Sequence, residues 1–588
     1  MTAFNRRLAL ALMGSSMMIP PAAAATGEDI RFQALSKRWL EGFVSTQPVT
    51  ATQIGDHRFD GEIDDMSAAA RARRTALWRA LLGELSRLDR AKLSRDSQVD
   101  AAILASQLQS MIWDDQRLQS WAWDALVWSA LAGNALYLLM ARDFAPATQR
   151  LRSATLRMNK LPKLLEQMRA EIVPARVPLI HATTVAKQNG GVMDIVDTMI
   201  LPQAKVLSAA EQSALKDAAN RLRAATAAHQ QWLDKVLVPQ AKGDFRIGAK
   251  LFDEKLVFTL NSQLTRKEIR VRAETAIRQT RAQMYEVARK ALAGRANPPA
   301  MPDHRGPADQ QRIIAAALAL ASDDRPARDA VVATAKNMLA QATDFVRHKD
   351  LITLPDAPVD LIIMPKFQQG VAVAYCDSPG PLEKGLKTFY AVSPIPEAWT
   401  KAQTGSFLRE YNNRGIADIT VHEAMPGHYV QLWHSNKCPS PIRAVLGSGS
   451  FVEGWAVYAE NVMAEEGFYG ADPLYRLVQL KVYLRSISNA ILDQAIHCDG
   501  MSREDAMRLM TQTAFQEERE AAGKWDRARM SATQLSTYFV GRQEHDGLRA
   551  QAEKRPGFAL KAYHDQVLSY GSAPARYVGA LMFGGAIT

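Results

Sequence analysis

The sequence predicts a mainly α-helical protein, a large helical body with a small β-sheet beside a histidine-bearing helix. Apolar residues recur at three- and four-residue intervals through most of residues 28–350, with charged residues between them. This spacing is typical of amphipathic helices. Residues 351–392 contain instead short β-branched or aromatic runs separated by Pro and Gly, which predict short strands. The helical pattern resumes near Ser406 and continues almost to the end of the chain.

The helical pattern is clearest in four segments of the N-terminal half. They are residues 69–88, 98–113, 208–238 and 266–293. The third opens on Ser208 with Glu211 three positions later, a capping-box pattern that marks the start of a helix. The stretch 121–139 is rich in aromatic and apolar residues, so we expect it to be buried. Three runs, residues 359–364, 371–375 and 387–392, make up the predicted sheet.

The first residues have the pattern of an export signal. Arg6 and Arg7 precede an apolar run at residues 8–13 and an alanine-rich stretch at residues 22–25, so we predict a secretory signal peptide over residues 1–24. The apolar run is shorter than the ~20 residues that cross a bilayer, and no later charge-free stretch reaches that length. We therefore expect a periplasmic or secreted protein with no integral membrane segment in its mature form.

The mature chain divides by pattern into a helical N-terminal region, residues 28–350, and a region of residues 351–588 that holds the sheet and the chemistry-bearing helices. The formal net charge of the 588 residues is +11, or +9 without the leader, and the basic residues are scattered. Zinc-finger spacing and basic-aromatic interleaving are both missing from the sequence, which argues against a nucleic-acid partner. The pattern does not indicate an oligomeric state.

Three cysteines are too few for a fold that depends on disulfides, although an oxidising compartment permits one bridge. Cys438 and Cys498 are the candidate pair, and the sequence leaves open whether they form it. Cys376 would then be free, and a lone cysteine without a motif is more often a packing residue than a nucleophile.

The chemistry is concentrated in the segment His422-Glu423-Ala424-Met425-Pro426-Gly427-His428. In the reference pattern His-Glu-x-x-His, two histidines four apart on a helix bind zinc and the adjacent Glu activates a water. Here the histidines are six apart, which is ~240° around a regular helix, so the rings would point apart. Pro426 and Gly427 can break the helix and return His428 to the face of His422. On spacing alone, a helix stop with one satisfied histidine is equally compatible, and His434 is a competing histidine nearby.

A catalytic zinc site usually has three protein ligands, so a third ligand is expected elsewhere. The segment 450–460 supplies Glu453 as the candidate ligand. Glu460 follows seven residues later on nearly the same helical face, where it can accept a hydrogen bond from a ligand histidine. An exposed helix charge is the alternative for Glu460. The preceding Gly-Ser-Gly-Ser stretch at residues 447–450 lacks the G-x-S-x-G arrangement of a serine hydrolase, and we interpret it as a flexible loop.

The segments VHEAMPGHYVQ at residues 421–431 and FVEGWAVYAE at residues 451–460 resemble a bacterial family catalogued as domain of unknown function 885. Its members carry HEAxPGHHLQ followed by EGWAxYxE and are taken to be zinc peptidase-like. Residues 484–506, residues 534–541 and the early stretch 48–57 are similar to other segments of that family, so the resemblance covers nearly the whole mature chain. FVEG is also similar to the third-ligand segment of the thimet oligopeptidase and dipeptidyl carboxypeptidase families. That likeness implies a zincin-like, neurolysin-like cleft.

The resemblance implies a set of roles. His422, His428 and Glu453 would hold Zn²⁺, Glu423 would accept a proton from water and pass it to the leaving amine, and Glu460 would orient a ligand histidine.

The same resemblance places further residues around that centre. Tyr538 or His497 would donate a hydrogen bond to the oxyanion that forms during the reaction. Asp493 would support the residues of the centre without binding the metal itself. Arg485 would bind a substrate carboxylate or pair with Asp493, and Tyr390 in the last predicted strand would contact substrate. An edge strand of the sheet can hold an extended peptide by main-chain pairing.

This chain departs from the family pattern at a few positions. Tyr429 stands where the family has a second histidine, so the metal role falls on His428. Ala532 and Thr533 replace a Pro-Gly, and Phe539 replaces a lysine, which puts contacts on the substrate side in doubt.

The leading hypothesis from the sequence is a zinc-dependent peptidase acting on exported or imported peptides. One alternative is a metal-dependent amidase with a non-peptide substrate, and another is a noncatalytic exported binding protein that keeps the fold. Glu423 argues against the last, because a residue that binds no metal has little use without water activation.

Overall fold

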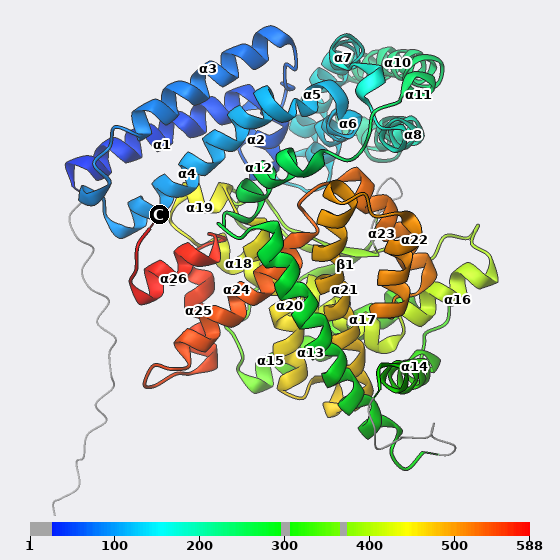
Figure 1. The fold of residues 1–588 in the computed structure, drawn as a ribbon. Coiled ribbons are helices and arrows are strands. Elements are labelled where there is room, and N and C mark those ends of the chain that lie inside the picture. The colour runs from blue at the N-terminus through cyan, green and yellow to red at the C-terminus, as the bar shows by residue number, and fades with distance from the viewer. Residues whose placement is uncertain (1–25, 296–305, 365–372, 588) are drawn as a thin grey trace, which may run out of the picture.

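The structure is a computed structural model that describes residues 26–295, 306–364 and 373–587. The predicted signal peptide lies outside these residues, as do the first two positions of the predicted second strand. Helices dominate, and the small sheet lies within them (Figure 1), so the prediction of a mainly α fold is confirmed. In the described part of the chain, no helix combines the length and apolar character that a membrane span requires.

The helices before the sheet begin close to the predicted positions. They are α1 (Gly27–Thr46), α2 (Pro48–Ile54), α3 (Ala68–Leu85), α4 (Arg95–Trp113), α5 (Ser120–Trp123), α6 (Ala125–Met140), α7 (Ala147–Glu171), α8 (Leu179–Gln188), α9 (Gly191–Ile195), α10 (Ala209–Trp232), α11 (Val238–Gln240), α12 (Gly248–Leu260), α13 (Arg266–Leu292), α14 (Pro307–Asp323) and α15 (Val331–Lys349). The capping box at Ser208 and Glu211 forms as expected and starts α10. The predicted buried stretch 121–139 is divided by Asp124, whose side chain caps α6.

The sheet has three strands, β1 (Asp360–Ile363), β2 (Ala374–Asp377) and β3 (Phe389–Val392). Their order is β1-β3-β2, with β1 parallel and β2 antiparallel to the central strand. The three predicted runs are therefore confirmed where the structure describes them. Strand β2 is an edge strand and packs against helix α17, which carries the first histidine of the motif.

The helices after the sheet carry all the candidate chemistry. They are α16 (Lys401–Glu410), α17 (Asn413–Glu423), α18 (His428–Ser435), α19 (Pro441–Val445), α20 (Gly449–Glu465), α21 (Pro473–Cys498), α22 (Arg503–Arg508), α23 (Glu518–Met530), α24 (Ser536–Ala552), α25 (Leu560–Ser569) and α26 (Ala575–Phe583). Helices α17, α20, α21 and α24 pack against one another in the middle of the molecule (Figure 1).

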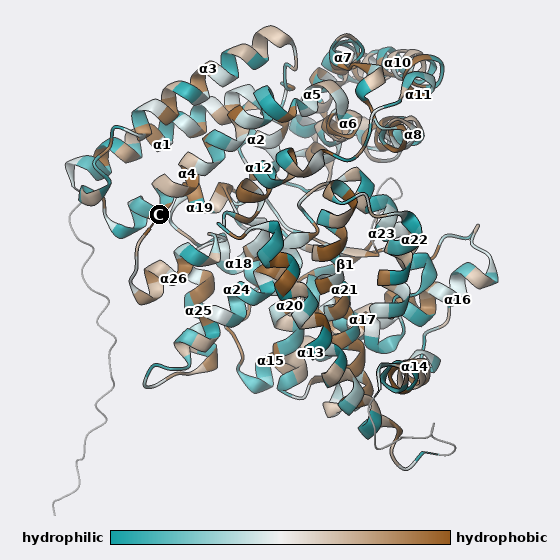
Figure 2. Ribbon diagram, in the orientation of Figure 1, coloured by the Kyte–Doolittle hydropathy of each residue, from teal (hydrophilic) through white to brown (hydrophobic). Residues whose placement is uncertain are grey.

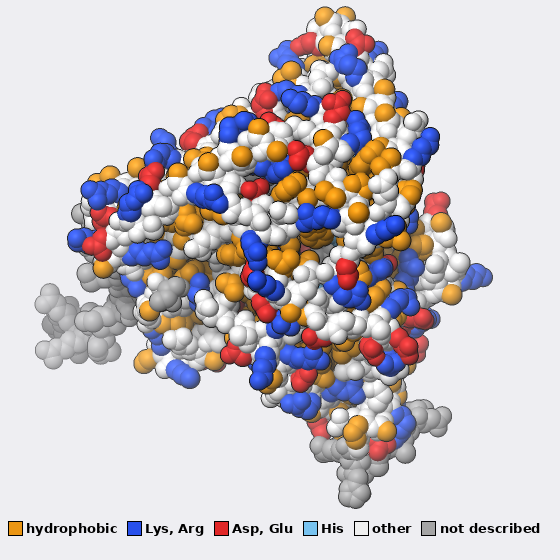
Figure 3. Space-filling model, turned by 45° about the horizontal axis from the view of Figure 1, so that its top comes forward, with side chains coloured by type: hydrophobic (Ala, Val, Ile, Leu, Met, Phe, Trp, Pro, Cys, Tyr) orange, Lys and Arg blue, Asp and Glu red, His pale blue; other side chains and the backbone are white. Residues whose placement is uncertain are grey.

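The apolar core is continuous between early and late parts of the chain. One buried cluster joins α1, α3 and α4 to the sheet, α17, α20 and α25, through residues such as Trp39, Leu104 and Phe451. A second cluster lies among α6, α7 and α10, and a third joins α13 to α21 and α24. Apolar positions face inward on these helices (Figure 2), while positive and negative side chains are interspersed on the face shown in Figure 3. The burial of α17 and α20 fixes the backbone that carries the candidate site.

Candidate metal centre

The two motif histidines and Glu453 come together in space. Glu453 Oε2 lies 3.7 Å from His422 Nε2 and 3.5 Å from His428 Nε2. The three candidate ligand atoms all lie within 4.8 Å of one another. The structure thus brings together the three residues predicted as metal ligands, which come from α17, α18 and α20.

This convergence depends on the break between α17 and α18. Helix α17 ends at Glu423 and α18 begins at His428, so Pro426 and Gly427 lie in a turn between them. Glycine is required there because a Cβ at Gly427 would lie 1.9 Å from the carbonyl oxygen of His422. The indole of Trp455 on α20 donates to the carbonyl of Pro426 at 3.0 Å and holds the turn. The predicted break is confirmed, and it leaves the two imidazole rings with centroids 4.8 Å apart.

Glu460 supports His422 from behind. Its Oε1 lies 2.6 Å from Nδ1 of His422, and the residue is 1% exposed. Such a contact fixes the imidazole so that Nε2 points toward the other two ligands. Asp418, one helical turn before His422, is also buried. Burial, and next the charge of Glu460, raise the pKa of Asp418 well above its usual value.

The geometry of the three donors fits a tetrahedral zinc ion. Zinc binds imidazole nitrogen and carboxylate oxygen at ~2.0–2.2 Å, which separates two ligand atoms by roughly 3.4 Å at a tetrahedral centre. The two separations from Glu453, 3.5 and 3.7 Å, are close to that value. Nδ1 of His428 is buried and has no hydrogen-bond partner among the described residues. Its Nε2 faces Glu453 and is the ring nitrogen placed to bind a metal. Two imidazoles and one carboxylate are a donor set that zinc accepts in catalytic sites.

Glu423 is adjacent to the cluster but does not belong to it. Its Oε2 accepts a hydrogen bond of 3.0 Å from the backbone N–H of Cys376 in β2. The edge strand thus orients the carboxylate beside the histidines. Burial, partly opposed by the positive charge of His422 and His428, raises the pKa of Glu423 above its ordinary value.

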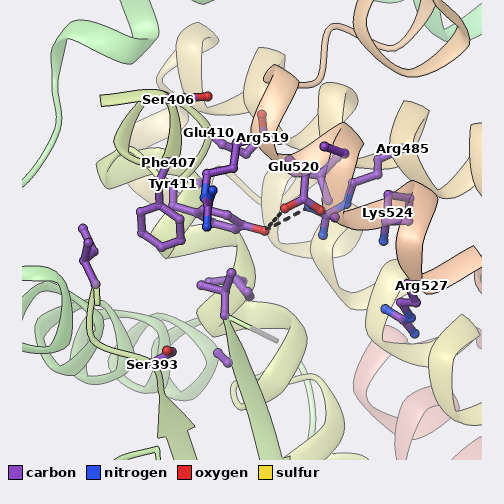
Figure 4. Close-up of a pocket in the computed structure, with 18 of the residues that line it drawn as sticks. Ser393, Ser406, Phe407, Glu410, Tyr411, Arg485, Arg519, Glu520, Lys524 and Arg527 are labelled. Atoms are coloured by element: carbon purple, nitrogen blue, oxygen red, sulfur yellow. Dashed lines mark hydrogen bonds and ion pairs between the residues drawn. The ribbon is translucent and has the colours of Figure 1, made fainter. Parts of the chain in front are cut away.

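A cavity of about 700 Å³ opens beside this cluster. His422 and Glu423 of α17 line part of it. Residues of α16, α21 and α23 contribute much of the remaining wall (Figure 4). Its size and its mixture of aromatic and charged walls are typical of a small-molecule or peptide site.

Tyr538 is a candidate oxyanion donor that lies close to the cluster. It lines the cavity, and its ring is stacked with that of His422 at a centroid distance of 6.5 Å. The phenol oxygen accepts a hydrogen bond of 3.0 Å from Arg527, so its own O–H remains free to donate. Burial, and next the charge of Glu453, raise the pKa of Tyr538, so the phenol stays protonated.

Arg485 also lines the cavity, and its partners differ from Asp493, the partner that the sequence suggested. Its guanidinium lies 3.2 Å from Glu520 and 3.3 Å from the hydroxyl of Tyr411, not against Asp493. Helix α23 brings Glu520 to this arginine, and no spacing within α21 could have indicated that contact.

The structure brings neither His497 nor Asp493 to the candidate metal centre. His497 is 2% exposed, does not line the cavity, and uses Nε2 to contact the carbonyls of Ala528 and Ser531, each at 2.9 Å. Asp493 accepts from the backbone N–H of Thr533 and of Ser536. The two residues therefore hold the end of α23 and the start of α24.

Tyr390 does not contact the cavity either. It is fully buried under the sheet, and its hydroxyl lies 3.1 Å from that of Thr420 on α17. Alternation along β3 points this side chain toward the helix, so it anchors α17 against the sheet.

The candidate disulfide between Cys438 and Cys498 is not formed, since all three cysteines are free. Cys438 packs against Gly571 near the C-terminus, whereas Cys498 lies at the end of α21 beside Arg266. The stretch at residues 447–450 is no flexible loop, because Ser448 caps α20 and Ser450 is buried within its first turn. His434 contacts the carbonyl of Thr353 rather than the cluster.

Two helices of the site touch through their backbones. A Cβ at Gly454 would lie 2.3 Å from the backbone of Gly541, and a Cβ at Gly541 would lie 1.8 Å from the carbonyl of Ser450. Only glycine permits this approach of α20 and α24, which places Glu453 and Tyr538 on facing helices.

Sequence reasoning missed the contribution of α23. Glu520, Lys524 and Arg527 line the cavity, and Arg519 stacks on Trp399 at 3.6 Å. The sequence does contain a sign of this wall. Glu520, Lys524 and Arg527 are spaced four and three residues apart, which puts them on one face of a helix.

Comparison with known proteins identifies the family. The family described as "Bacterial protein of unknown function (DUF885)" matches residues 48–582. The chain belongs to this family. No curated protein matches it.

Solved structures have the same fold. One from Shewanella oneidensis, described as "a putative lipoprotein of unknown function", is 32% identical with a TM-score of 0.77, and the match covers 94% of this chain and 99% of that one. A putative lipoprotein from Colwellia psychrerythraea is 16% identical with a TM-score of 0.76, over 94% of this chain and 98% of that one.

Proposed function

We propose that this protein is a zinc-dependent peptidase, with His422, His428 and Glu453 as the metal ligands. The observation that carries the proposal is the approach of these three donors, with Glu460 fixed behind one of them. Glu423, which is held beside the cluster and faces a cavity large enough for a peptide segment, supports hydrolysis rather than metal storage.

Each residue has a definite task in this proposal. Bound Zn²⁺ supplies Lewis acidity, which polarises a carbonyl and makes water more acidic. The carboxylate of Glu423 takes a proton from the attacking water and returns it to the nitrogen of the leaving amine. The hydroxyl of Tyr538 donates to the substrate carbonyl oxygen as negative charge develops on it. The contact from Cys376 N–H holds the Glu423 carboxylate in place during both transfers.

The proposal is tested by metal analysis and peptide hydrolysis on the same preparations. The parent protein and Glu423→Gln should bind zinc equally, because Glu423 is not a ligand, and only the parent should cleave peptides. Glu397→Gln is the matched control, since Glu397 is exposed near the cavity and should retain activity. Full activity in protein free of divalent metal would contradict the proposal, and so would cleavage of non-peptide amides alone.

We further propose that the protein is exported. The leader pattern of residues 1–24 supports this, as do the two related structures described as putative lipoproteins. Fractionation of bacterial cells that express the full chain should find the protein outside the inner membrane. Recovery in the cytoplasm alone, at the full-length mass, would contradict it.

A further inference from the structure

One face of α23 forms a charged wall of the cavity. Glu520, Lys524 and Arg527 are spaced four and three residues apart, and all three line the cavity (Figure 4). Helix α23 packs against α21, which carries Arg485 in the same wall.

Most cations around this wall are already neutralised. Their partners are Glu520 for Arg485 at 3.2 Å, Glu410 for Lys481 at 2.7 Å and Glu517 for Arg409 at 2.6 Å. Glu520 also accepts from the hydroxyl of Tyr411 at 3.0 Å. Glu520 lies one helical turn before Lys524, but its carboxylate already contacts Arg485 and Tyr411.

Lys524 and Arg527 have no such partner. Arg519, which also lines the cavity, has no ion pair within the described chain but stacks on Trp399. Lys524 is 7% exposed, yet it has neither a hydrogen bond nor an ion pair with any residue that the structure describes. Arg527 donates to Gln534 and Tyr538, which are neutral, and has no carboxylate partner within the described chain. A buried cation without a counter-charge costs free energy. Burial, and next the charge of Arg485, lower the pKa of Lys524 to about 7, partly opposed by the negative charge of Glu520.

The uncompensated cations lie close to the candidate metal centre. Arg527 contacts the Tyr538 hydroxyl at 3.0 Å, and the Tyr538 ring is 6.5 Å from that of His422. An extended peptide advances by ~3.3 Å per residue, so a few residues span this separation. A peptide that reaches buried Lys524 meets the packed face of α21 and α23, which favours a chain terminus over a continuing chain.

We propose that Lys524 and Arg527 bind the C-terminal carboxylate of the substrate, so that the protein acts near the C-termini of peptides. This inference rests on the proposed peptidase function and names its substrate class. Carboxylates form short, strong hydrogen bonds with ammonium and guanidinium groups, and the two side chains present both donors from adjacent turns of one helix.

Binding measurements without turnover test this proposal. Zinc-loaded and metal-free Glu423→Gln protein is titrated by calorimetry with one peptide in two forms, ending in a free carboxylate or in an amide. We expect the carboxylate form to bind about 10- to 100-fold more tightly, the range for losing charged hydrogen bonds. Lys524→Met should remove most of that preference and Lys524→Arg should retain it.

Lys554→Met removes an exposed lysine and should leave the preference unchanged. Equal binding of both forms by the parent would overturn the proposal, as would a full preference in Lys524→Met. If that variant does not fold, Arg527→Gln replaces it with the same expectation.

A third peptide distinguishes the source of the carboxylate. An amidated peptide ending in glutamate should bind weakly, and binding as tight as that of the free terminus would overturn the assignment to the C-terminus. Because binding is measured alone, a carboxylate preference without cleavage by the parent would contradict only the peptidase function. Cleavage without the preference would contradict only the subsite.

Discussion

Substitution of Glu460 by glutamine tests how the candidate metal centre is held. Glu460 Oε1 lies 2.6 Å from His422 Nδ1 in a fully buried position. Glutamine preserves the volume and an acceptor oxygen but removes the negative charge that makes His422 a better ligand. Losing such a partner typically weakens metal binding by ~10–100-fold. That loss equals about 1.4–2.7 kcal/mol of zinc-binding free energy.

Chelator competition measures the zinc dissociation constant directly. Glu465→Gln on the same helix is the matched control, because Glu465 contacts Asn461 and Arg549 rather than a ligand. We expect the metal-free Glu460→Gln protein to unfold at no lower a temperature than the parent, since the charge of Glu460 raises the pKa of buried Asp418 by repulsion. Unchanged zinc affinity would refute the idea that Glu460 orients His422.

Two further predictions concern stability away from the metal. Gly541→Ala should lower the unfolding temperature, by overpacking of ~1–3 kcal/mol or more, because its Cβ would lie 1.8 Å from a carbonyl oxygen of α20. Gly547→Ala on the same helix has open space and should not lower it. Burial alone would lower the pKa of His57, but the hydrogen bonds that its ring donates to Asp60 and Glu383 raise it to about 9, from 6.5. Its stabilising contribution should be complete below pH 6.5 and lost as the pH rises through about 9, and thermal unfolding of His57→Gln should lack that decline.

The sequence was sufficient to predict the helical fold and the three strands, and it named the three candidate ligands that the structure brings together. Amphipathic spacing is a local signal, and so is the Pro-Gly insertion that shows where α17 must break. Glu453 was found because zinc needs a third donor and the segment after residue 450 offers a carboxylate on a helix. The Glu460 contact followed from helical geometry, since seven residues return to nearly the same face.

The contacts that the sequence did not indicate are those with a partner from a distant helix. His497 and Asp493 lie in a matching segment of α21, but they face the ends of α23 and α24. Arg485 meets Glu520 because α23 packs beside α21, and Lys524 is left unpaired for the same reason. Tertiary packing decides these orientations, and neither periodicity nor motif spacing carries that information.

The contact between Gly454 and Gly541 has a mechanical consequence. Most packed helices are separated by side chains, which can change rotamer and absorb small movements. Here the backbones of α20 and α24 are in direct contact. A shift or tilt of α24 therefore moves α20 with it. Glu453 and Tyr538, one on each helix beside this contact, move as parts of a single stiff unit. Their separation is set by the backbone crossing itself, so it is insensitive to side-chain changes elsewhere along the two helices.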